Sequence, residues 1–299
     1  MNCCKIVNNM TAKPVYETIF GRYKEDKPVK STWNLYQVKF PGDTSYRTKH
    51  KIRLAYHNEL EFHYIKRGGG SYFIKNRKYP FSKNHLVIIK PGEIHTFIPG
   101  TPSFIEKGSL YFLPSFLPRK ELKFITGKCP HIVRLTEKEA TLAEILLKSI
   151  GEEAGGREEK WENIVKHEVM LFLSIAERAS VRKSICVRKN PLTEKIMDFM
   201  EQNFAQNLPV SEIAKTFSLS ASRISHIFKQ ETGLSLKNYI LQRRIVEAKK
   251  LLSEDAGMKV SAVSIRTGFN DFTLFNRSFK NITGMTPTSY RRISMQNRD

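Results

Sequence analysis

Two sets of polar side chains in the last third of this 299-residue chain share one spacing and similar hydrogen-bonding groups. Each set occupies positions i, i+3, i+4 and i+7, which lie on one face of a helix. The sets are Ser222, Ser225, His226 and Lys229, and then Thr273, Asn276, Arg277 and Lys280. Groups of this kind can bind the edges of nucleic-acid bases. Arginine holds guanine with two hydrogen bonds, asparagine holds adenine, and threonine contacts the thymine methyl group.

Base contact and phosphate contact fall to different positions on these faces. Lys229 and Lys280 come toward the C-terminal ends of the expected helices, where contact with a phosphate is predicted. Arg223, next to Ser222, completes the predicted base-reading set. The alternative is that both faces are ordinary solvated helix surfaces, because a short motif match alone does not decide between the two.

The residues around the two faces are repeated, which favours the base-reading interpretation. The stretch 228–235, with Tyr239, returns 51 positions later as 279–286, with Tyr290. Such a repeat indicates one small structural unit used twice. Each copy has a short amphipathic helix, a turn and a second helix, which is the pattern of a helix-turn-helix.

The elements that must position these faces are all helical. Ser220 and Asp271 are the expected N-caps of the second helix in each copy, and Gly233 is suited to end that helix in the first. A stiff helix from Ser235 to Ser253, about 27 Å long, could hold the two recognition helices about one DNA turn apart. The predicted helices are 192–205, 210–217, 221–231, 236–253, 260–267 and 271–282, with a last turn near 287–293.

Residues 191–299 resemble the DNA-binding domain of the AraC/XylS family of bacterial transcription regulators. The resemblance implies that the two polar faces read promoter DNA, and it favours activation through contact with RNA polymerase. A repressor would have the same sequence features. Two departures stand out: Ser264-Ile265 lies where the second copy usually has Ile-Ala, and Phe272 takes a place that is often polar. The residues that carry the resemblance are Ile213-Ala214, the stretch 228–239, Gly268-Phe269-Asn270-Asp271, Phe275, Arg277, Phe279-Lys280, Gly284, Thr286-Pro287 and Tyr290-Arg291.

The front half has a different texture, with short strand-like runs separated by turn signals. Runs such as Leu60 to Lys66 and His85 to Ile89 end at Gly68-Gly69-Gly70 and at Pro91-Gly92-Glu93. Several short strands of this kind predict an antiparallel barrel or sandwich over about 33–115.

Three residues of this half, His57, Glu61 and His95, resemble the paired motifs of a cupin barrel, the usual partner domain in that family. Metal-binding cupins have a His-x-His pair, a glutamate and a later histidine, but Ala55 stands where the first histidine belongs. Three interpretations of these residues remain: a metal site with one free coordination position, a small-molecule pocket, or core histidines with structural hydrogen bonds. We favour the pocket, and expect no metal and no cofactor. Its predicted lining is His57, Glu61, Phe62, Tyr64, Tyr72, His95 and Phe97.

A helical pair is expected over about 137–180, beginning at an N-cap, Thr136. The apolar positions of its second helix, from about Glu158 to Ala179, exceed what one buried stripe needs. The pair is therefore expected to cover the barrel, to mediate a homodimer, or both. The predicted organisation is an effector-binding and dimerisation domain over 1–180, a basic linker over 181–191 and a DNA-binding domain over 192–299. The fold class is therefore an all-β barrel with a helical pair, followed by an all-α double helix-turn-helix.

Composition supports a folded protein that binds a polyanion. The net charge is +21, but residues 191–299 carry only 16 Lys and Arg against 10 Asp and Glu, so bulk charge does not locate the interface. Cys3, Cys4, Cys129 and Cys186 fit neither a zinc site nor a disulfide framework. Because we find neither a secretory leader nor a membrane span, a cytoplasmic protein is expected.

The sequence thus predicts a ligand-responsive transcription regulator that is not an enzyme and has no catalytic residues. Expected partners are double-stranded promoter DNA, a small-molecule effector with a carbohydrate as first guess, RNA polymerase and a second copy of the chain. Two rivals stay open. One is a metal-dependent cupin enzyme fused to a DNA-binding module, and the other is an architectural DNA binder that needs no effector.

Overall fold

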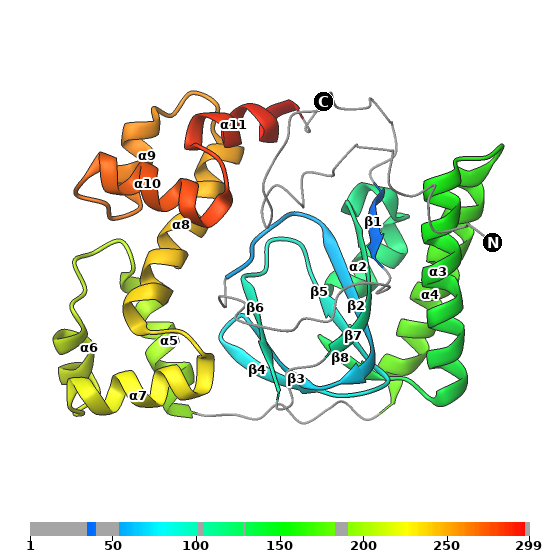
Figure 1. Cartoon of the computed structure of the whole chain (residues 1–299), viewed down its shortest axis with the longest axis horizontal. Coiled ribbons are helices and arrows are strands. Elements are labelled where there is room, and N and C mark those ends of the chain that lie inside the picture. The colour runs from blue at the N-terminus through cyan, green and yellow to red at the C-terminus, as the bar shows by residue number, and fades with distance from the viewer. Residues whose placement is uncertain (1–34, 40–53, 101–104, 128, 183–190, 297–299) are drawn as a thin grey trace, which may run out of the picture. The chain divides into compact units, whose positions relative to one another are not determined.

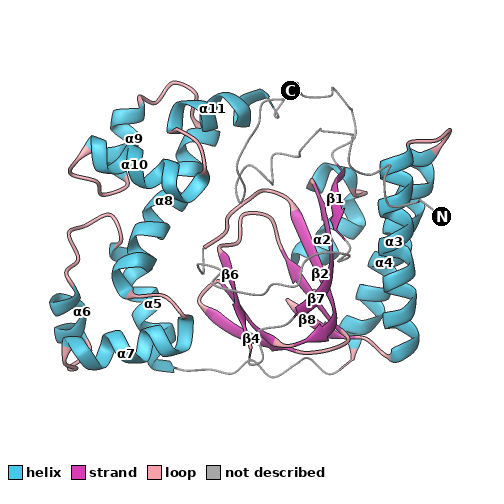
Figure 2. Ribbon diagram, viewed as in Figure 1, coloured by secondary structure: helices cyan, strands magenta, loops and turns pink. Residues whose placement is uncertain are grey.

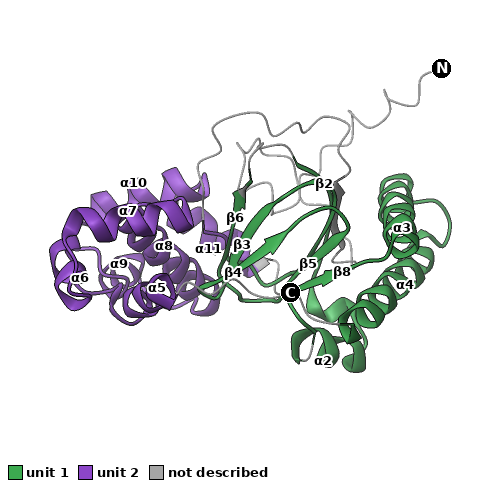
Figure 3. Ribbon diagram, turned by 90° about the horizontal axis from the view of Figure 1, so that it is seen from below, with its two compact units in different colours: residues 1–12, 26–51, 56–188 green, residues 13–25, 52–55, 189–299 purple. Residues whose placement is uncertain are grey.

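The computed structural model describes residues 35–39, 54–100, 105–127, 129–182 and 191–296, and they fall into two compact units (Figures 1 and 3). The first unit holds the described residues from 56 to 182 together with strand β1, and the second holds residues 54–55 and 191–296. Cys3, Cys4, Cys186 and most of the predicted linker lie outside the described residues.

The first unit is built on two antiparallel sheets (Figure 2). This arrangement confirms the predicted sheet-rich front half. The five-stranded sheet has the order β1-β7-β2-β5-β8, and the three-stranded sheet has the order β4-β3-β6. The strands are β1 (Leu35–Lys39), β2 (Leu60–Gly68), β3 (Gly70–Ile74), β4 (Arg77–Phe81), β5 (His85–Ile89), β6 (His95–Pro99), β7 (Ile105–Phe112) and β8 (Ile132–Arg134).

Strand β2 is buried on both faces and lies between two hydrophobic cores. Successive side chains of a strand point to opposite faces. Leu60, Phe62 and Tyr64 therefore belong to the core shared with the helices. Glu61 and His63 are on the other face, with Ile65, which packs in a second core between the two sheets. Functional groups on that second face are shielded from water.

The helices of the first unit pack against the five-stranded sheet. Helix α3 contacts α4, β2 and β7, and α4 contacts β8. The α3–α4 pair was predicted from the sequence, whereas α2 and β8 were not. Helix α2 is rich in charged residues and has one fully buried side chain, so it has no clear apolar stripe. Strand β8 has only three residues, which is too short to show alternation. The helices are η2 (Pro114–Phe116), α2 (Arg119–Gly127), α3 (Glu137–Gly156) and α4 (Trp161–Val181).

Glu139 joins the start of α3 to the end of α4. It forms a capping box with Thr136, the predicted N-cap, and its carboxylate accepts hydrogen bonds from Arg178 (Nε to Oε1, 2.9 Å) and from Arg182. Burial opposes ionisation of this carboxyl group. The hydrogen bonds from Arg182, Thr136 and Arg178 outweigh burial and lower its pKa to about 2.

Glu139→Gln is expected to lower the free energy of unfolding of the first unit by about 1–3 kcal/mol at neutral pH, because the variant loses a charge that is paired when folded. The depressed pKa means that this contribution is complete above the unfolded pKa of about 4.3 and is lost as the pH falls toward 2. Urea unfolding followed by tryptophan fluorescence reports on this part of the chain, since both tryptophans, Trp33 and Trp161, precede residue 191.

The matched control is Glu137→Gln, because Glu137 lies in the same first turn but its side chain is 79% exposed. A loss in Glu139→Gln that is equally large at pH 7 and pH 3 would contradict the assignment.

The described residues of the second unit from 191 on form helices joined by short loops. Each of the six predicted helices is present, and the predicted caps are confirmed. Ser220 and Asp271 accept hydrogen bonds from backbone N–H groups of α7 and α10, and Gly233 ends α7 with φ 71°. The helices are α5 (Pro191–Asn203), α6 (Val210–Thr216), α7 (Ala221–Thr232), α8 (Leu236–Glu254), α9 (Val260–Arg266), α10 (Phe272–Thr283) and α11 (Pro287–Gln296).

Helix α8 connects the two helix-turn-helix copies. Its 19 residues span about 28 Å, and it contacts α7 near one end of the unit and α9, α10 and α11 near the other (Figure 1). Arg243 of α8 donates to Glu201 of α5 (Nε to Oε2, 2.6 Å), and Arg244 donates to the Phe204 carbonyl oxygen (2.7 Å). These bonds fix α8 against α5 and the residue that follows α5.

Candidate DNA interface and interior histidine cluster

The two helix-turn-helix copies have the same buried positions. Ile224 and Phe228 of α7 correspond to Phe275 and Phe279 of α10, and all four side chains are fully buried. The equivalence holds at an offset of 51 for these second helices. Figure 3 places α7 and α10 on the same side of this unit.

The first helices of the two copies correspond at an offset of 50. Helices α6 and α9 each have seven residues, and the buried pair Ile213-Ala214 matches Val263-Ser264. The prediction that Ser264-Ile265 takes the place of the Ile-Ala pair is therefore wrong, because the longer second turn shifts the alignment by one residue. Ser264 is buried in the place of an alanine, and Ile265 is exposed.

Most of the predicted contact residues lie on the surface of α7 and α10. Two are half-buried: Ser225 and Asn276. Both donate to a carbonyl of their own helix, Ser225 Oγ to Ala221 (2.6 Å) and Asn276 Nδ2 to Phe272 (3.0 Å). The Asn276 amide has a second N–H group, so this local bond does not by itself prevent two hydrogen bonds to a base. The exposed members are Ser222, Arg223, His226, Lys229, Thr273, Arg277 and Lys280.

Apolar side chains also lie exposed at the start of α10. Phe272 is 48% exposed and its ring stacks on buried Phe275 (centroids 6.2 Å apart), and Leu274 is 42% exposed. No role was assigned to Phe272 from the sequence, and Leu274 was not among the predicted contact residues. An apolar group beside Thr273 can contact a thymine methyl group.

The turn between α9 and α10 depends on Gly268. Its φ is +85°, and a Cβ at this position would lie 2.4 Å from the carbonyl oxygen of Ala205. The corresponding residue of the first copy is Ser218, with φ 53°. The left-handed backbone thus accepts a side chain in one copy, and the close approach to Ala205 is what requires glycine in the other.

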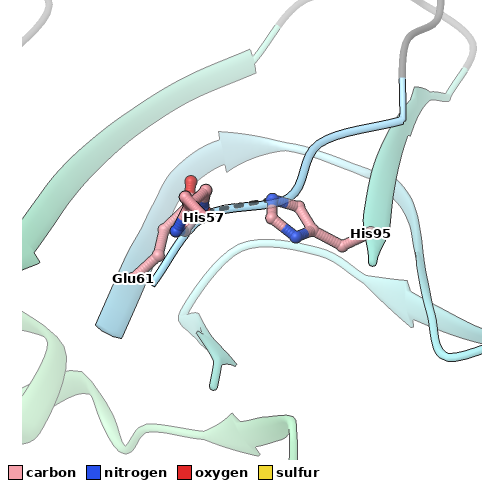
Figure 4. Close-up of side chains that lie close together, drawn as sticks. All are labelled: His57, Glu61 and His95. Atoms are coloured by element: carbon pink, nitrogen blue, oxygen red, sulfur yellow. Dashed lines mark hydrogen bonds and ion pairs between the residues drawn. The ribbon is translucent and has the colours of Figure 1, made fainter. Parts of the chain in front are cut away.

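In the first unit, the interior face of β2 brings together three residues predicted from the sequence (Figure 4). His57 precedes β2, Glu61 lies on it and His95 begins β6. The Nε2 atoms of His57 and His95 lie 2.8 and 3.1 Å from Oε2 of Glu61, and all three residues are buried. Candidate metal-ligand atoms of the three lie within 4.8 Å of one another.

Other polar residues of this interior were missed by the sequence analysis. His63 approaches the other carboxylate oxygen of Glu61 with its Nε2 atom. Its Nδ1 atom lies 2.7 Å from Ser109 Oγ and 3.2 Å from Lys107 Nζ, and Lys107 also donates to the Tyr72 hydroxyl group (3.2 Å). The period of two along β2 from Glu61 was the signal that could have found His63.

Burial and charge shift several pKa values in this cluster. Burial opposes protonation of His57, but hydrogen bonds and charge attraction from Glu59 and Glu61 raise its pKa to about 9. Burial and the charge of Lys107 lower the pKa of His63 to about 4. Burial lowers the pKa of Lys107 to about 8. Burial alone would raise the pKa of the Glu61 carboxyl group, but its histidine neighbours hold that pKa well below the usual range.

The predicted pocket residues divide between the two faces of β2. Tyr72 and Phe97 lie on the interior side with the histidine cluster; their rings are 5.4 Å apart and His63 stacks on Tyr72. Tyr64 and Phe62 lie on the opposite face, in the core shared with the helices, because their positions alternate with Glu61 and His63. The expectation that Tyr64 and Phe62 line the pocket is therefore corrected.

Two family models match this chain. Residues 37–159 match the model of an AraC-like ligand binding domain, and residues 213–293 match that of a helix-turn-helix domain. YdiP, an uncharacterized HTH-type transcriptional regulator of Escherichia coli K12, is 24% identical over 93% of this chain and 92% of that protein. The Escherichia coli K12 melibiose operon regulatory protein is 23% identical over 92% and 95%, respectively. The Streptococcus mutans Msm operon regulatory protein is 33% identical over 34% and 37%.

The fold and these matches define a two-domain transcription regulator with an N-terminal ligand-binding domain and a C-terminal helix-turn-helix domain that binds DNA. The chain belongs to the AraC family, as the sequence analysis predicted. Within the described residues, no helix combines the length and the apolar character needed to cross a membrane.

Proposed function

We propose that this protein activates transcription from promoters that it recognises with α7 and α10 together, in response to a small molecule bound in its front unit. The observation that supports this most is the repetition of one exposed polar face on two helices joined by the rigid helix α8. Two such faces can enter adjacent major-groove segments of one duplex. Where the spacing falls short of one DNA turn, the DNA bends.

The base-reading role is assigned to the polar residues in the first two turns of each recognition helix. On α10 these are Thr273, Asn276 and Arg277, with Arg277 fully available for a guanine because its side chain is exposed. The lysines one turn further on, Lys229 and Lys280, are assigned to phosphates. The assigned residues on α7 are Ser222, Arg223, Ser225 and His226.

Lys280→Ala is expected to weaken binding to specific and non-specific DNA by similar factors. A phosphate contact carries no sequence information, and its loss reduces the slope of log affinity against log salt by about 1. Fluorescence anisotropy of labelled duplexes over a series of salt concentrations measures both quantities. An unchanged salt slope, or a loss confined to one sequence, would contradict the phosphate assignment.

For the effector, a carbohydrate is our first candidate. It is supported by one relative, the regulatory protein of a melibiose operon, which aligns over nearly the whole chain. The interior face with His57, Glu61 and Lys107 offers donors and acceptors, and the Tyr72 and Phe97 rings offer apolar walls. Few polar groups among aromatic side chains are typical of small-molecule sites.

Dimerisation is assigned to the helical pair. Ile145 of α3 and Leu171 of α4 are 57% and 46% exposed, so each helix has a large apolar side chain that a second copy could cover. Contact with RNA polymerase at promoter DNA in the cytoplasm completes the proposal.

The experiment that tests the proposal is selection of genomic fragments by the purified full-length protein, followed by sequencing. We expect fragments that share two short conserved segments about 10 base pairs apart, upstream of a small number of genes. Adding the sugars that those genes process should then change the affinity. Retention of fragments without any shared sequence would favour the architectural DNA binder instead.

A further inference from the structure

We propose that the interior of the front unit binds one divalent transition-metal ion of the zinc type through His57 Nε2, Glu61 Oε2 and His95 Nε2. The three ligand atoms come from a loop and two strands that belong to different sheets, and they converge in a buried position. Two imidazole nitrogens and one carboxylate oxygen form a ligand set that suits zinc with one position left open. This goes beyond the sequence analysis, which expected no metal because Ala55 replaces a histidine.

The hydrogen bonds of His95 favour a cation at this point. Its Nδ1 atom lies 2.9 Å from the backbone carbonyl oxygen of Glu93, which can only accept, so Nδ1 carries the proton. In the neutral ring, Nε2 is then an acceptor, and it faces an oxygen of the Glu61 carboxylate, another acceptor, at 3.1 Å. Two buried acceptors in contact repel each other unless a proton or a metal ion lies between them, and a metal ion bound by both removes the repulsion.

His57 is held in a similar way. Its Nδ1 atom lies 3.4 Å from Oε2 of Glu59, and its Nε2 atom points at Glu61. Both ligand histidines therefore have Nδ1 against an oxygen and Nε2 toward one common point. Oxygen partners on the far nitrogen are the usual support of a metal-bound histidine, because they fix the tautomer and orient the ring.

His63 is a positioning residue for Glu61. Lys107 can only donate, so His63 Nδ1, 3.2 Å from Lys107 Nζ, is an acceptor and His63 Nε2 carries the proton. This N–H donates to Oε1 of Glu61, which leaves Oε2 for the metal. Ligand atoms at about 2.1 Å in a tetrahedral site are about 3.4 Å apart, so Glu61 Oε2 needs to move away from each histidine nitrogen by only a few tenths of an ångström.

The open fourth position faces an interior that the proposed effector would share. If effector binding as proposed is correct, an oxygen atom of the effector can complete the coordination; this part rests on the proposed function, and the metal site itself does not.

The test is metal binding to the full-length protein in which both Cys3 and Cys4 are replaced by serine. These two thiols are adjacent in sequence and could otherwise bind Zn²⁺ themselves. After treatment with a chelator, Zn²⁺ is titrated against a colorimetric indicator, and the metal content is measured after dialysis. We expect one Zn²⁺ per chain, and more than about 100-fold weaker binding in His57→Gln and in His95→Gln. The matched control is His167→Gln, because His167 is exposed on α4 and its replacement should leave Zn²⁺ binding unchanged.

Failure to bind stoichiometric Zn²⁺, or undiminished binding in both glutamine variants, would overturn the proposal. If a variant does not unfold cooperatively, Co²⁺ added to the parent protein decides. Strong visible absorption of four-coordinate cobalt supports the site, whereas the weak spectrum of hydrated Co²⁺ overturns it. None of these measurements involves DNA or an effector, so failure here is distinguishable from failure of the proposed regulatory function.

Discussion

Arg277→Ala is expected to weaken binding to a specific promoter site by about 1–3 kcal/mol, which is about 5- to 150-fold, and to relax the preference at one base pair. The reason is that the exposed guanidinium on α10 is the side chain best suited to hold a guanine with two hydrogen bonds. Competition binding of the wild-type site and of sites substituted at each position measures both effects. At the affected base pair, the variant should no longer distinguish the four bases.

The control for charge alone is Arg292→Ala, because Arg292 is an exposed arginine of α11, outside the two recognition helices. Arg292→Ala should change the free energy of DNA binding little and leave the preference at every base pair unchanged. Equal losses in the two variants would mean that Arg277 contributes only its charge.

Gly268→Ala is expected to lower the free energy of unfolding of the DNA-binding unit by about 2–4 kcal/mol and to reduce DNA affinity with it. Two costs add: a side chain at φ +85°, and a Cβ that would lie 2.4 Å from the Ala205 carbonyl oxygen, where backbone must move to make room. Because Gly268 sets the entry into α10, that movement displaces the recognition helix. Thermal denaturation followed by the helical circular dichroism signal measures the loss.

Gly257→Ala is the matched control in the same unit. A Cβ there would meet nothing closer than 3.5 Å, from the flexible side chain of Asp255. This variant should change the free energy of unfolding by less than about 1 kcal/mol. Similar losses at the two glycines would show that the contact with Ala205 does not require glycine at position 268.

The DNA-binding unit could be predicted closely because its signals are local and occur twice. The polar caps Ser220 and Asp271 and the helix-ending Gly233 depend on neighbours in sequence, and each is found in its predicted role. The misalignment of Ser264-Ile265 arose from a single residue inserted in the second turn. Periodicity within each helix is preserved across such an insertion, but the offset between copies is not.

The front unit could be predicted only in outline. Its sheet-rich character follows from short apolar runs and turns, but the lining of the interior depends on which way each strand faces. Tyr64 and His63 are neighbours in sequence on opposite faces of β2, and one was selected while the other was missed. The inward position of Lys107 depends on the pairing of β7 with β2, which are far apart in the sequence.

The central claim, that α7 and α10 read one duplex together, is tested most directly by methylation interference at guanine N7 on a site recovered from the genome. The account predicts two clusters of interfering guanines in the major groove, about one helical turn apart on one face of the DNA. It also predicts that Arg277→Ala removes interference in one cluster only. A single cluster with the wild-type protein, or two clusters on opposite faces, would contradict it.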